Sequence, residues 1–181
     1  MSPDRLGAGA AYQASLLAAL GDDDPADVQA ATSAALAGLV RDAGDDVRTR
    51  PDPGEWSVVE CLGHIADGEL VVSTRYRWIL AADAPALAGY DQDDWVRALA
   101  HGDDDPAALL DLFGALRRAN LALWAGFGAV AGDRIGMHGE RGPESYDLTF
   151  RLAAGHDRVH LAQARAALAR VRASRGGAPE R

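Results

Sequence analysis

The segment Ala153–Gln163, which reads AAGHDRVHLAQ, contains two histidines spaced four residues apart, His156 and His160. Residues four apart in an α-helix lie on the same face, one turn above the other, with their side chains leaning in the same direction. The segment therefore predicts a helix that points two imidazoles at one place. A single helix can supply two ligands to a metal ion in this way.

A second stretch, Ser57–His64, reads SVVECLGH; it also predicts a helix and carries a third histidine, His64. Metal sites in helical bundles are built from side chains on facing helices, and neutral imidazole is a good ligand for Zn, Ni, Cu and Fe. We interpret His64, His156 and His160 as the ligands of one divalent metal. Structural zinc sites usually close four positions with cysteine among the ligands, so three histidines predict a site with positions open for water or substrate.

Glycines precede two of these histidines, Gly63 before His64 and Gly155 before His156. A glycine inside a helix costs about 1 kcal/mol relative to alanine, and it is tolerated where a backbone or a ligand must approach closely. The two glycines therefore indicate close approaches beside the candidate ligands. Tight helix packing without any metal is the alternative explanation.

The length and composition fit one globular domain. The chain has 181 residues, of which 48% are hydrophobic and 25% are charged. No apolar run reaches the ~18 residues that cross a bilayer, and the N-terminus lacks the pattern of a secretory signal. We therefore expect a cytoplasmic protein with no membrane partner. The single cysteine, Cys61, excludes an internal disulfide framework.

The charge balance argues against nucleic acid as a partner. The formal net charge is −9, and all 18 basic residues are arginine. A surface that binds nucleic acid needs a basic stripe, and the sequence contains none. We attribute the missing lysine to genome composition rather than to function.

Helix start and stop signals divide the first part of the chain. Residues 10–20 predict a short helix, and Asp24 with Pro25 then provides a cap and a first-turn proline for a helix that ends near residue 43. The segment RPDPG over residues 50–54 is a strong helix breaker.

The second long helix starts at Ser57. Ser57 and Glu60 have the spacing of a capping box, and Trp56 stands where a hydrophobic staple would. Apolar residues lie on more than one side of this helix, as in the interior of a bundle. We expect it to continue up to an acidic connection over residues 83–104, which has a helical turn near residues 91–100.

Two further helices complete the pattern. Asp105 and Pro106 start a helix that ends near residue 129, and the last helix runs over about residues 147–173. The segment 132–146 between them is rich in glycine and turn residues, and we see no credible strand pair.

These elements predict an all-α fold, an up-down four-helix bundle with a long connection between its second and third helices. We divide the chain into an N-terminal extension with a short helix (1–24), the bundle (25–173) and a disordered tail (174–181).

Side chains near the histidines have alternative interpretations. Cys61 lies three residues before His64 and has two interpretations. It is either a reserve metal ligand or redox partner, or a small buried side chain that fills the core, and we favour the second. Glu60 is explained by the capping box. Asp67, Glu69 and Asp157 are candidates to hold an imidazole N–H, as metal-bound histidines usually require, with surface solvation as the default for all three. Asp157 points off the ligand face, which favours Asp67 or Glu69.

Residues in the connections have a second set of alternatives. His101 and His138 lie in acidic and glycine-rich loops, where exposed histidines are ordinary. His138 alternatively borders the mouth of a pocket, because its segment leads into the helix of His156. Tyr90 and Trp95 either cover the pocket from the long connection or anchor that connection through hydrophobic contacts.

Two motifs resemble the signatures of a known family, the DinB-like (YfiT-like) superfamily. The segment Pro53–Ser57 (PGEWS), continuing to Glu60, Gly63–Asp67 (GHIAD) and Glu69, resembles the second-helix signature. The segment Arg134–His138 (RIGMH) with Gly142, followed by His156, Asp157 and His160–Gln163 (HLAQ), resembles the last-helix signature. The resemblance covers roughly residues 25–172, with both motifs in the expected order.

The resemblance implies a four-helix bundle that holds a divalent metal on His64, His156 and His160. The metal would be zinc or nickel first, with iron, manganese or copper as further choices. Members of the superfamily include transferases and isomerases that use a low-molecular-weight thiol (mycothiol, bacillithiol or glutathione), members described as metal-dependent hydrolases, and domains without known activity.

Two functions from different classes follow as hypotheses. The first is a metal-dependent enzyme, a thiol S-transferase or a hydrolase, acting on a small-molecule substrate. The second is a non-catalytic metal-binding bundle that acts through dimerisation or partner binding. A homodimer is plausible for a bundle of this size.

Overall fold

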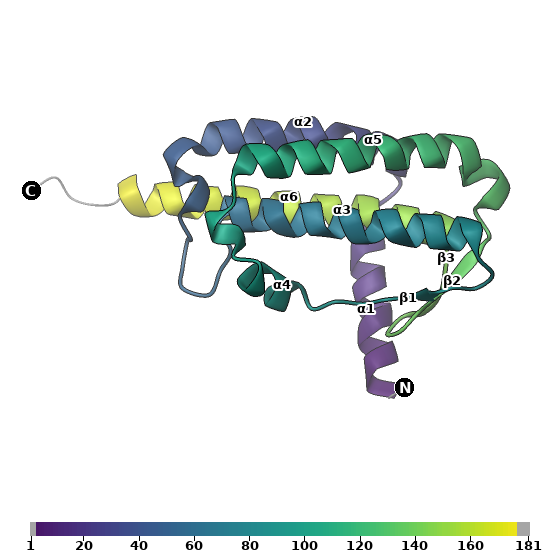
Figure 1. The fold of residues 1–181 in the computed structure, drawn as a ribbon. Helices are drawn as coiled ribbons and strands as arrows, with labels where there is room; N and C mark the ends of the chain where they lie inside the picture. Colours follow the sequence, from purple (N-terminus) through teal and green to yellow (C-terminus); the bar gives the residue numbers. More distant parts are fainter. Residues whose placement is uncertain (1–2, 177–181) are drawn as a thin grey trace, which may run out of the picture.

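The computed structural model describes residues 3–176, and four long helices packed side by side set its long axis (Figure 1). The bundle consists of α2 (Pro25–Ala43), α3 (Val58–Ala81), α5 (Pro106–Ala131) and α6 (Tyr146–Gly176). The four-helix bundle and the long connection between its second and third helices are therefore confirmed.

This long connection is a crossover that returns the chain to the end where α3 begins. Arg48, just before α3, donates hydrogen bonds to the backbone oxygens of Gly102 and Asp104, just before α5. At the other end, Arg134 after α5 donates from Nε to the backbone oxygen of Ile79 in the last turn of α3, at 2.8 Å. Helices α3 and α5 therefore run in the same direction, and α2 and α6 run in the opposite one (Figure 1). The crossover thus breaks the simple up-down alternation that the sequence predicted within the four-helix bundle.

Short elements occupy the connections. They are η1 (Gly44–Arg48), β1 (Ala86–Leu87), α4 (Gln92–Ala98), η2 (His101–Asp103), β2 (Ile135–His138) and β3 (Gly142–Ser145). Helix α4 confirms the helical turn predicted near residues 91–100. Asp91 caps it by accepting a hydrogen bond from the backbone N–H of Asp94, at 2.9 Å.

The expectation of no strand pair is wrong. Strands β2 and β3 form an antiparallel hairpin, with Ile135 opposite Ser145, and β1 joins β2 in parallel, with Ala86 opposite Met137. The strands have only two to four residues each, too few for a periodic pattern to emerge from the sequence. Parallel pairing with the distant β1 is a tertiary contact that no local signal announces.

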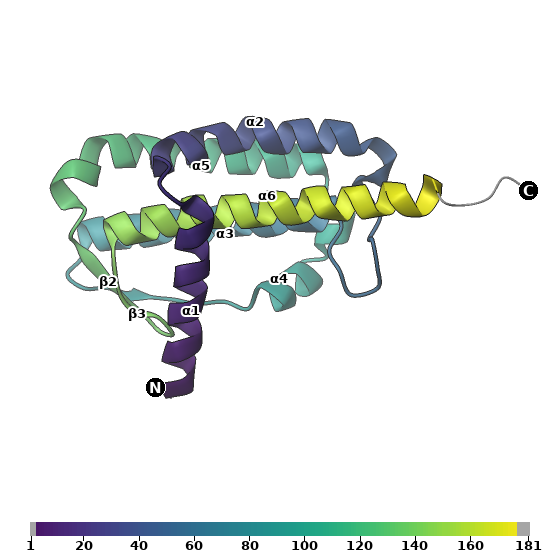
Figure 2. The same cartoon turned by 180° about the vertical axis from the view of Figure 1, so that it is seen from behind.

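Helix α1 (Pro3–Leu20) is longer than the predicted segment 10–20 and crosses α6 steeply (Figure 2). Leu16 and Leu20 are buried in this crossing. A Cβ atom added to Gly155 of α6 would lie 2.1 Å from the backbone oxygen of Leu16. The close approach predicted from Gly155 is therefore present, and it is made by α1 rather than by a ligand.

Helix α6 continues to Gly176, so the first residues of the predicted tail are helical. Residues 177–181, the rest of that tail, lie outside the described residues.

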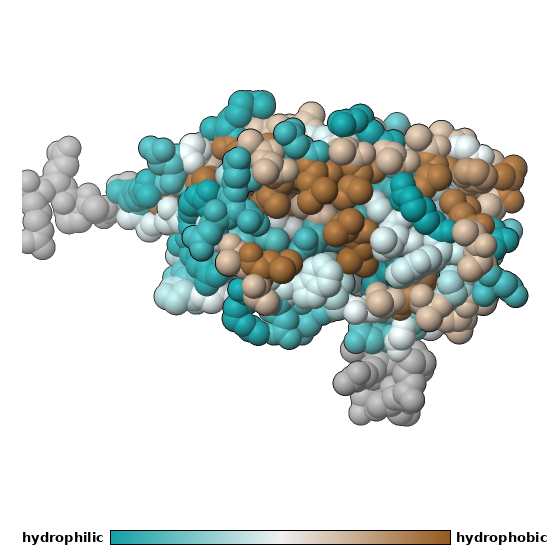
Figure 3. Space-filling model, in the orientation of Figure 1, coloured by the Kyte–Doolittle hydropathy of each residue, from teal (hydrophilic) through white to brown (hydrophobic). Residues whose placement is uncertain are grey.

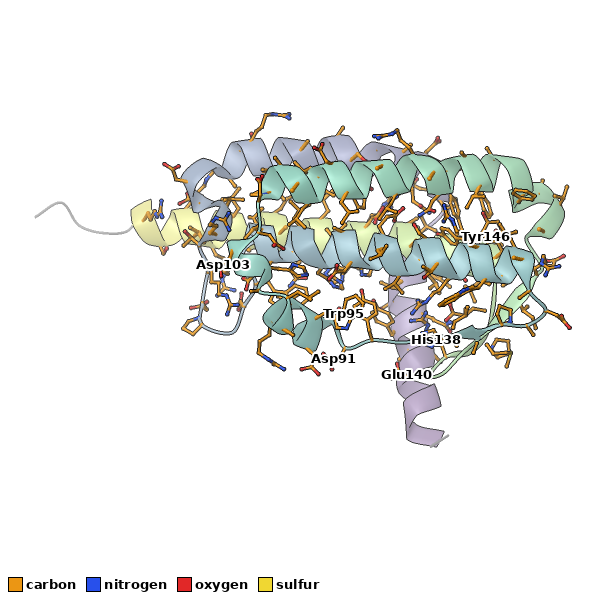
Figure 4. All side chains as sticks on the ribbon, viewed as in Figure 1. Asp91, Trp95, Asp103, His138, Glu140 and Tyr146 are labelled. Atoms are coloured by element: carbon orange, nitrogen blue, oxygen red, sulfur yellow. The ribbon has the colours of Figure 1, made fainter. Side chains whose placement is uncertain are left out.

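Two hydrophobic clusters occupy the ends of the bundle. One, toward the hairpin, is aromatic: Tyr146 (Figure 4) packs with Tyr76 and Phe150, and Trp124 stacks on Phe150 with ring centroids 3.9 Å apart. The other contains Trp56 and Cys61. Trp56 and Cys61 occupy the N′ and N4 positions of α3, which is the arrangement of a hydrophobic staple.

The outer face of α5 exposes several large apolar side chains. Figure 3 shows hydrophobic surface gathered along this helix, where Leu112, Phe127 and Val130 are exposed. Within the part of the chain that the structure describes, no helix is both long and apolar enough to cross a membrane.

Candidate metal centre

The start of α3 fixes the position of His64. The Ser57 hydroxyl accepts from the backbone N–H of Glu60, and the Glu60 carboxylate accepts from the backbone N–H of Ser57, which completes the predicted capping box. Arg50 also pairs with Glu60 and helps to hold its pKa below the usual value against the effect of burial. His64 follows in the second turn and is buried.

Helix α6 brings His156 and His160 to the same point. His64 Nε2 lies 2.9 Å from His156 Nε2 and 3.2 Å from His160 Nε2. One nitrogen from each ring falls within a group whose members all lie within 4.8 Å of one another. Three nitrogens bound to a tetrahedral ion at about 2.1 Å would lie about 3.4 Å apart, so little movement separates this arrangement from a coordinated one.

The surroundings keep all three imidazoles neutral. Burial, followed by the neighbouring His160 and His101, lowers the pKa of His64 to about 3. Burial with the His160 and His64 rings holds the pKa of His156 well below its usual value, and burial lowers that of His160. A neutral imidazole offers the lone pair that a metal needs.

The donor set fits a cation. His64 Nε2 has one position in the ring plane, a hydrogen or a lone pair, and it can point at His156 or at His160 but not at both, so the three nitrogens cannot all be well paired with one another. A cation between them would accept all three lone pairs. Among the described residues, this group contains no carboxylate or thiolate that would close a fourth position.

Neighbouring side chains hold the rings of His64 and His160 in place. His160 Nδ1 lies 2.8 Å from the Oε1 of Gln163, one turn further along α6, which orients Nε2 toward the other histidines. Trp56 packs against His64 and His160, with ring centroids 5.1 and 6.1 Å away. His64 Nδ1 is buried and has no hydrogen-bond partner among the described residues.

The carboxylates predicted to hold an imidazole have other partners. Asp67 Oδ2 lies 2.8 Å from His101 Nε2 rather than beside a candidate ligand. Glu69 and Asp157 both pair with Arg117, whose Nη2 lies 2.8 Å from Glu69 Oε2. The default of surface solvation is therefore wrong for Glu69 and Asp157, which are buried. Gln163 holds His160 instead.

His101 is buried, whereas its position in an acidic loop indicated an exposed histidine. It is 4% exposed, and its Nδ1 lies 2.6 Å from Asp104 Oδ2. Burial alone would lower the pKa of His101, but the hydrogen bonds to Asp104 and Asp67 outweigh it and raise that pKa. A Cβ at Gly63 would lie 2.4 Å from the His101 ring, which explains the glycine.

Cys61 is the buried filler that we favoured. It is fully enclosed, and burial followed by the charge of Glu60 raises the pKa of its thiol to about 12. A thiol that stays protonated is a poor ligand and a poor nucleophile. It also lies outside the group of three histidines.

A cavity of about 640 Å³ opens beside the histidines, between α1, α3, α6, the long connection and the hairpin. His64 and His156 line this cavity. His138 and Tyr90 also line it, in agreement with the interpretation that placed each of them at a pocket. Trp95, labelled in Figure 4, packs on Tyr90 with ring centroids 4.4 Å apart and so supports this part of the wall without lining the cavity itself.

The sequence analysis missed Arg75, Arg117 and Gln163. Arg75 lines the cavity, Arg117 is buried between two carboxylates and Gln163 orients His160. A helical spacing of three residues from His160 was the one available signal for Gln163. The two arginines fall on helical faces that look ordinary in the sequence.

Comparisons with known proteins agree with this architecture. The model of the DinB superfamily matches residues 26–164. A protein of Geobacillus thermodenitrificans, provisionally named a metal-dependent hydrolase, is 30% identical over 67 residues, or 37% of this chain. That alignment spans only 36% of the relative's length.

A solved structure shares the fold. YfiT from Bacillus subtilis, described as a probable metal-dependent hydrolase with an unusual four-helix bundle topology, superposes with a TM-score of 0.74 at 22% identity. The match covers 82% of this chain and 86% of YfiT. With three clustered histidines in a bundle whose third helix follows a crossover, and a family match over most of its length, this chain belongs to the DinB superfamily.

Proposed function

We propose that this chain holds one divalent metal ion on His64, His156 and His160 and acts as a metal-dependent hydrolase of a small molecule. The observation that carries the proposal is the meeting of three neutral imidazole nitrogens at the wall of a cavity of about 640 Å³. The names of two similar proteins point to the same chemistry. We expect zinc or nickel first; imidazole also suits iron and copper, and manganese is a further choice.

Bound at such a centre, a divalent ion lowers the pKa of a water molecule toward neutrality or keeps a thiol deprotonated. The chain would supply the surroundings for this chemistry. His64 and His156 line the cavity, whereas His160 is buried and is not part of the cavity wall, so it is shielded from bulk water.

Two residues shape the space next to His156. A Cβ at Gly68 would lie 3.2 Å from His156 Cε1 and 3.6 Å from the Tyr90 hydroxyl, so the glycine leaves room between them. Burial, followed by the charge of Asp67, raises the pKa of Tyr90, which keeps its hydroxyl protonated. Tyr90 would therefore serve as a hydrogen-bond donor to a ligand beside the metal.

Transfer of a low-molecular-weight thiol is the close variant of this proposal. The same three histidines would bind the thiolate, and the cavity would accept the electrophile. Loading the protein with Co²⁺ and adding 2-mercaptoethanol distinguishes the two. A new sulfur-to-cobalt charge-transfer band favours the thiol variant, and an unchanged spectrum together with hydrolysis of activated esters favours the hydrolase.

The His160→Ala variant tests whether the centre is functional at all. For an enzyme we expect loss of metal and of ester hydrolysis with a nearly unchanged melting temperature. Collapse of the fold, or a wild-type protein that binds metal but turns over neither esters nor thiol adducts, would instead favour a non-catalytic bundle that dimerises or binds a partner.

A further inference from the structure

Arg75 lies at the other end of the same cavity from His64. Both residues line the cavity and both belong to α3, eleven positions apart, which is close to three full turns and therefore one face of the helix. Their Cα atoms are separated by about 16 Å along the helix axis. The cavity thus runs lengthwise along α3 from the histidines to a guanidinium.

The positive charge of Arg75 is buried without a carboxylate. Arg75 is 7% exposed, and no Asp or Glu among the described residues lies within ion-pair distance of its guanidinium. Arg117, also a buried arginine, pairs with two carboxylates. An unpaired buried charge is costly, so its presence calls for a compensating function.

The hydrogen bonds of Arg75 are also incomplete. Nη2 donates to the backbone oxygen of Ala88 and lies 3.3 Å from His138 Nε2. Nε is buried without a partner, and Nη1 makes no hydrogen bond to a described residue. Two of the three guanidinium nitrogens therefore lack an acceptor among the described residues.

His138 has the same excess of donors. Its Nδ1 accepts from the backbone N–H of Glu140 at 3.1 Å, and Figure 4 labels both residues. Its Nε2 lies 3.3 Å from Arg75 Nη2. A neutral imidazole has one accepting nitrogen, so one of these two contacts sets a donor against a donor. An acceptor atom supplied from the cavity would resolve the conflict. Burial, followed by Arg141 and Arg75, lowers the pKa of His138 to about 4, in keeping with a locally positive potential.

The other charges along the cavity are already matched or exposed. Glu144 is paired with Arg141 and also accepts from Gln13. Glu69 and Asp157 are paired with Arg117. The remaining acidic side chains on the cavity wall are exposed ones at its rim: Asp91, Asp93 and Glu140. Among the described residues of the cavity wall, Arg75 is left as the unmatched buried charge.

We propose that Arg75 and His138 form a binding site for a carboxylate of the small molecule on which the metal centre acts, which is therefore an elongated anion. A guanidinium N–H and an imidazole N–H match the two oxygens of one carboxylate. The carboxylate site itself needs no metal. Only the claim that its ligand is also the molecule on which the metal centre acts rests on the proposed function.

The first experiment uses metal-free full-length protein and glutarate as the probe, and it follows the ring signals of His138 by NMR. The wild type and Arg118→Gln, which removes an exposed arginine of α5, should show a saturable shift of these signals. Arg75→Gln should bind glutarate at least 10-fold more weakly, and Arg75→Lys should fall between. Near-UV circular dichroism verifies that each variant is folded. Absence of a saturable shift in the wild type, or equal binding by Arg75→Gln, would overturn the anion site.

The second experiment links the site to the metal centre. Co²⁺-loaded protein is titrated with 6-mercaptohexanoate and with 6-mercaptohexan-1-ol, and the sulfur-to-cobalt band gives both affinities. The acid should bind about 10-fold more tightly than the alcohol in the wild type and Arg118→Gln, but not in Arg75→Gln. Equal affinities in the wild type would refute occupation of both ends by one molecule. Failure of cobalt to bind at all would refute the proposed function and leave the glutarate result standing.

Discussion

At the residue scale, Arg117 joins the helices of the bundle through one guanidinium. It contacts Glu69 of α3, Asp157 of α6 and the backbone oxygen of Gln29 in α2, all within hydrogen-bond distance. Asn120 donates to Glu69 at 2.7 Å and completes the network. Asp157 follows His156 directly, so this network also fixes the turn of α6 that presents the ligand.

Replacing Arg117 by methionine should destabilise the protein strongly. The change leaves two buried carboxylates without their cation, and loss of one partner from a buried ion pair costs about 3–5 kcal/mol. Urea denaturation measures the change in the free energy of unfolding. Arg118→Met, at the exposed neighbouring position, should change it by less than about 0.5 kcal/mol. Similar values for both variants would contradict the role given to the network.

Gln163 offers a test of metal binding that leaves the ligands intact. Gln163→Leu removes the acceptor for His160 Nδ1 and should lower metal affinity about 10–100-fold, as losses of such orienting contacts do. Competition with a chelator measures this affinity. Gln163→Glu keeps an acceptor and should retain binding. Unchanged affinity in Gln163→Leu would mean that packing by Trp56 alone orients the ring.

His101 makes the stability depend on pH. The pKa of His101 in the folded state is raised above the usual 6.5. Its contribution to the free energy of unfolding is therefore complete below pH 6.5 and is lost as the pH rises through the folded-state pKa. The stability advantage of the wild type over His101→Gln should therefore shrink between neutral and alkaline pH. Unfolding free energies measured for both proteins from pH 6 to 9 give this difference. A constant difference would mean that His101 acts through packing alone.

At the element scale, two helical glycines should respond in opposite ways to alanine. Gly155→Ala places a methyl against the backbone oxygen of Leu16, so α1 must move away from α6. Gly126 of α5 has no atom near its added Cβ, so Gly126→Ala should stabilise the protein by about 0.5–1 kcal/mol. Hydrogen exchange should show loss of protection in α1 for Gly155→Ala only. Unchanged protection there would contradict the tight crossing.

Local signals explain which elements could be predicted. The capping box at Ser57 and the Asp-Pro pairs at Pro25 and Pro106 are short-range patterns, and each one starts a helix in the structure. The sheet could not be predicted in this way, because β1 lies within the crossover and pairs with β2, which follows α5. The burial of His101 likewise depends on Gly63 and Asp67, which lie more than thirty residues earlier.

At the scale of the whole molecule, the crossover shapes the cavity. Because α3 and α5 run in the same direction, the connection between them passes along α3 and carries Tyr90 to the cavity wall. The hairpin after α5 then brings His138 to the same wall. The spacing of His156 and His160 predicted part of the site, whereas its far end at Arg75 depends on this path of the chain.

The central claim is that His64, His156 and His160 together hold one divalent ion. Elemental analysis of tag-free protein, loaded with Zn²⁺ or Ni²⁺ and then dialysed, tests it directly. We predict about one ion per chain in the wild type and almost none in His64→Ala, with both proteins folded. Metal-free wild-type protein after loading, or a His64→Ala variant that retains as much metal as the wild type, would contradict the claim.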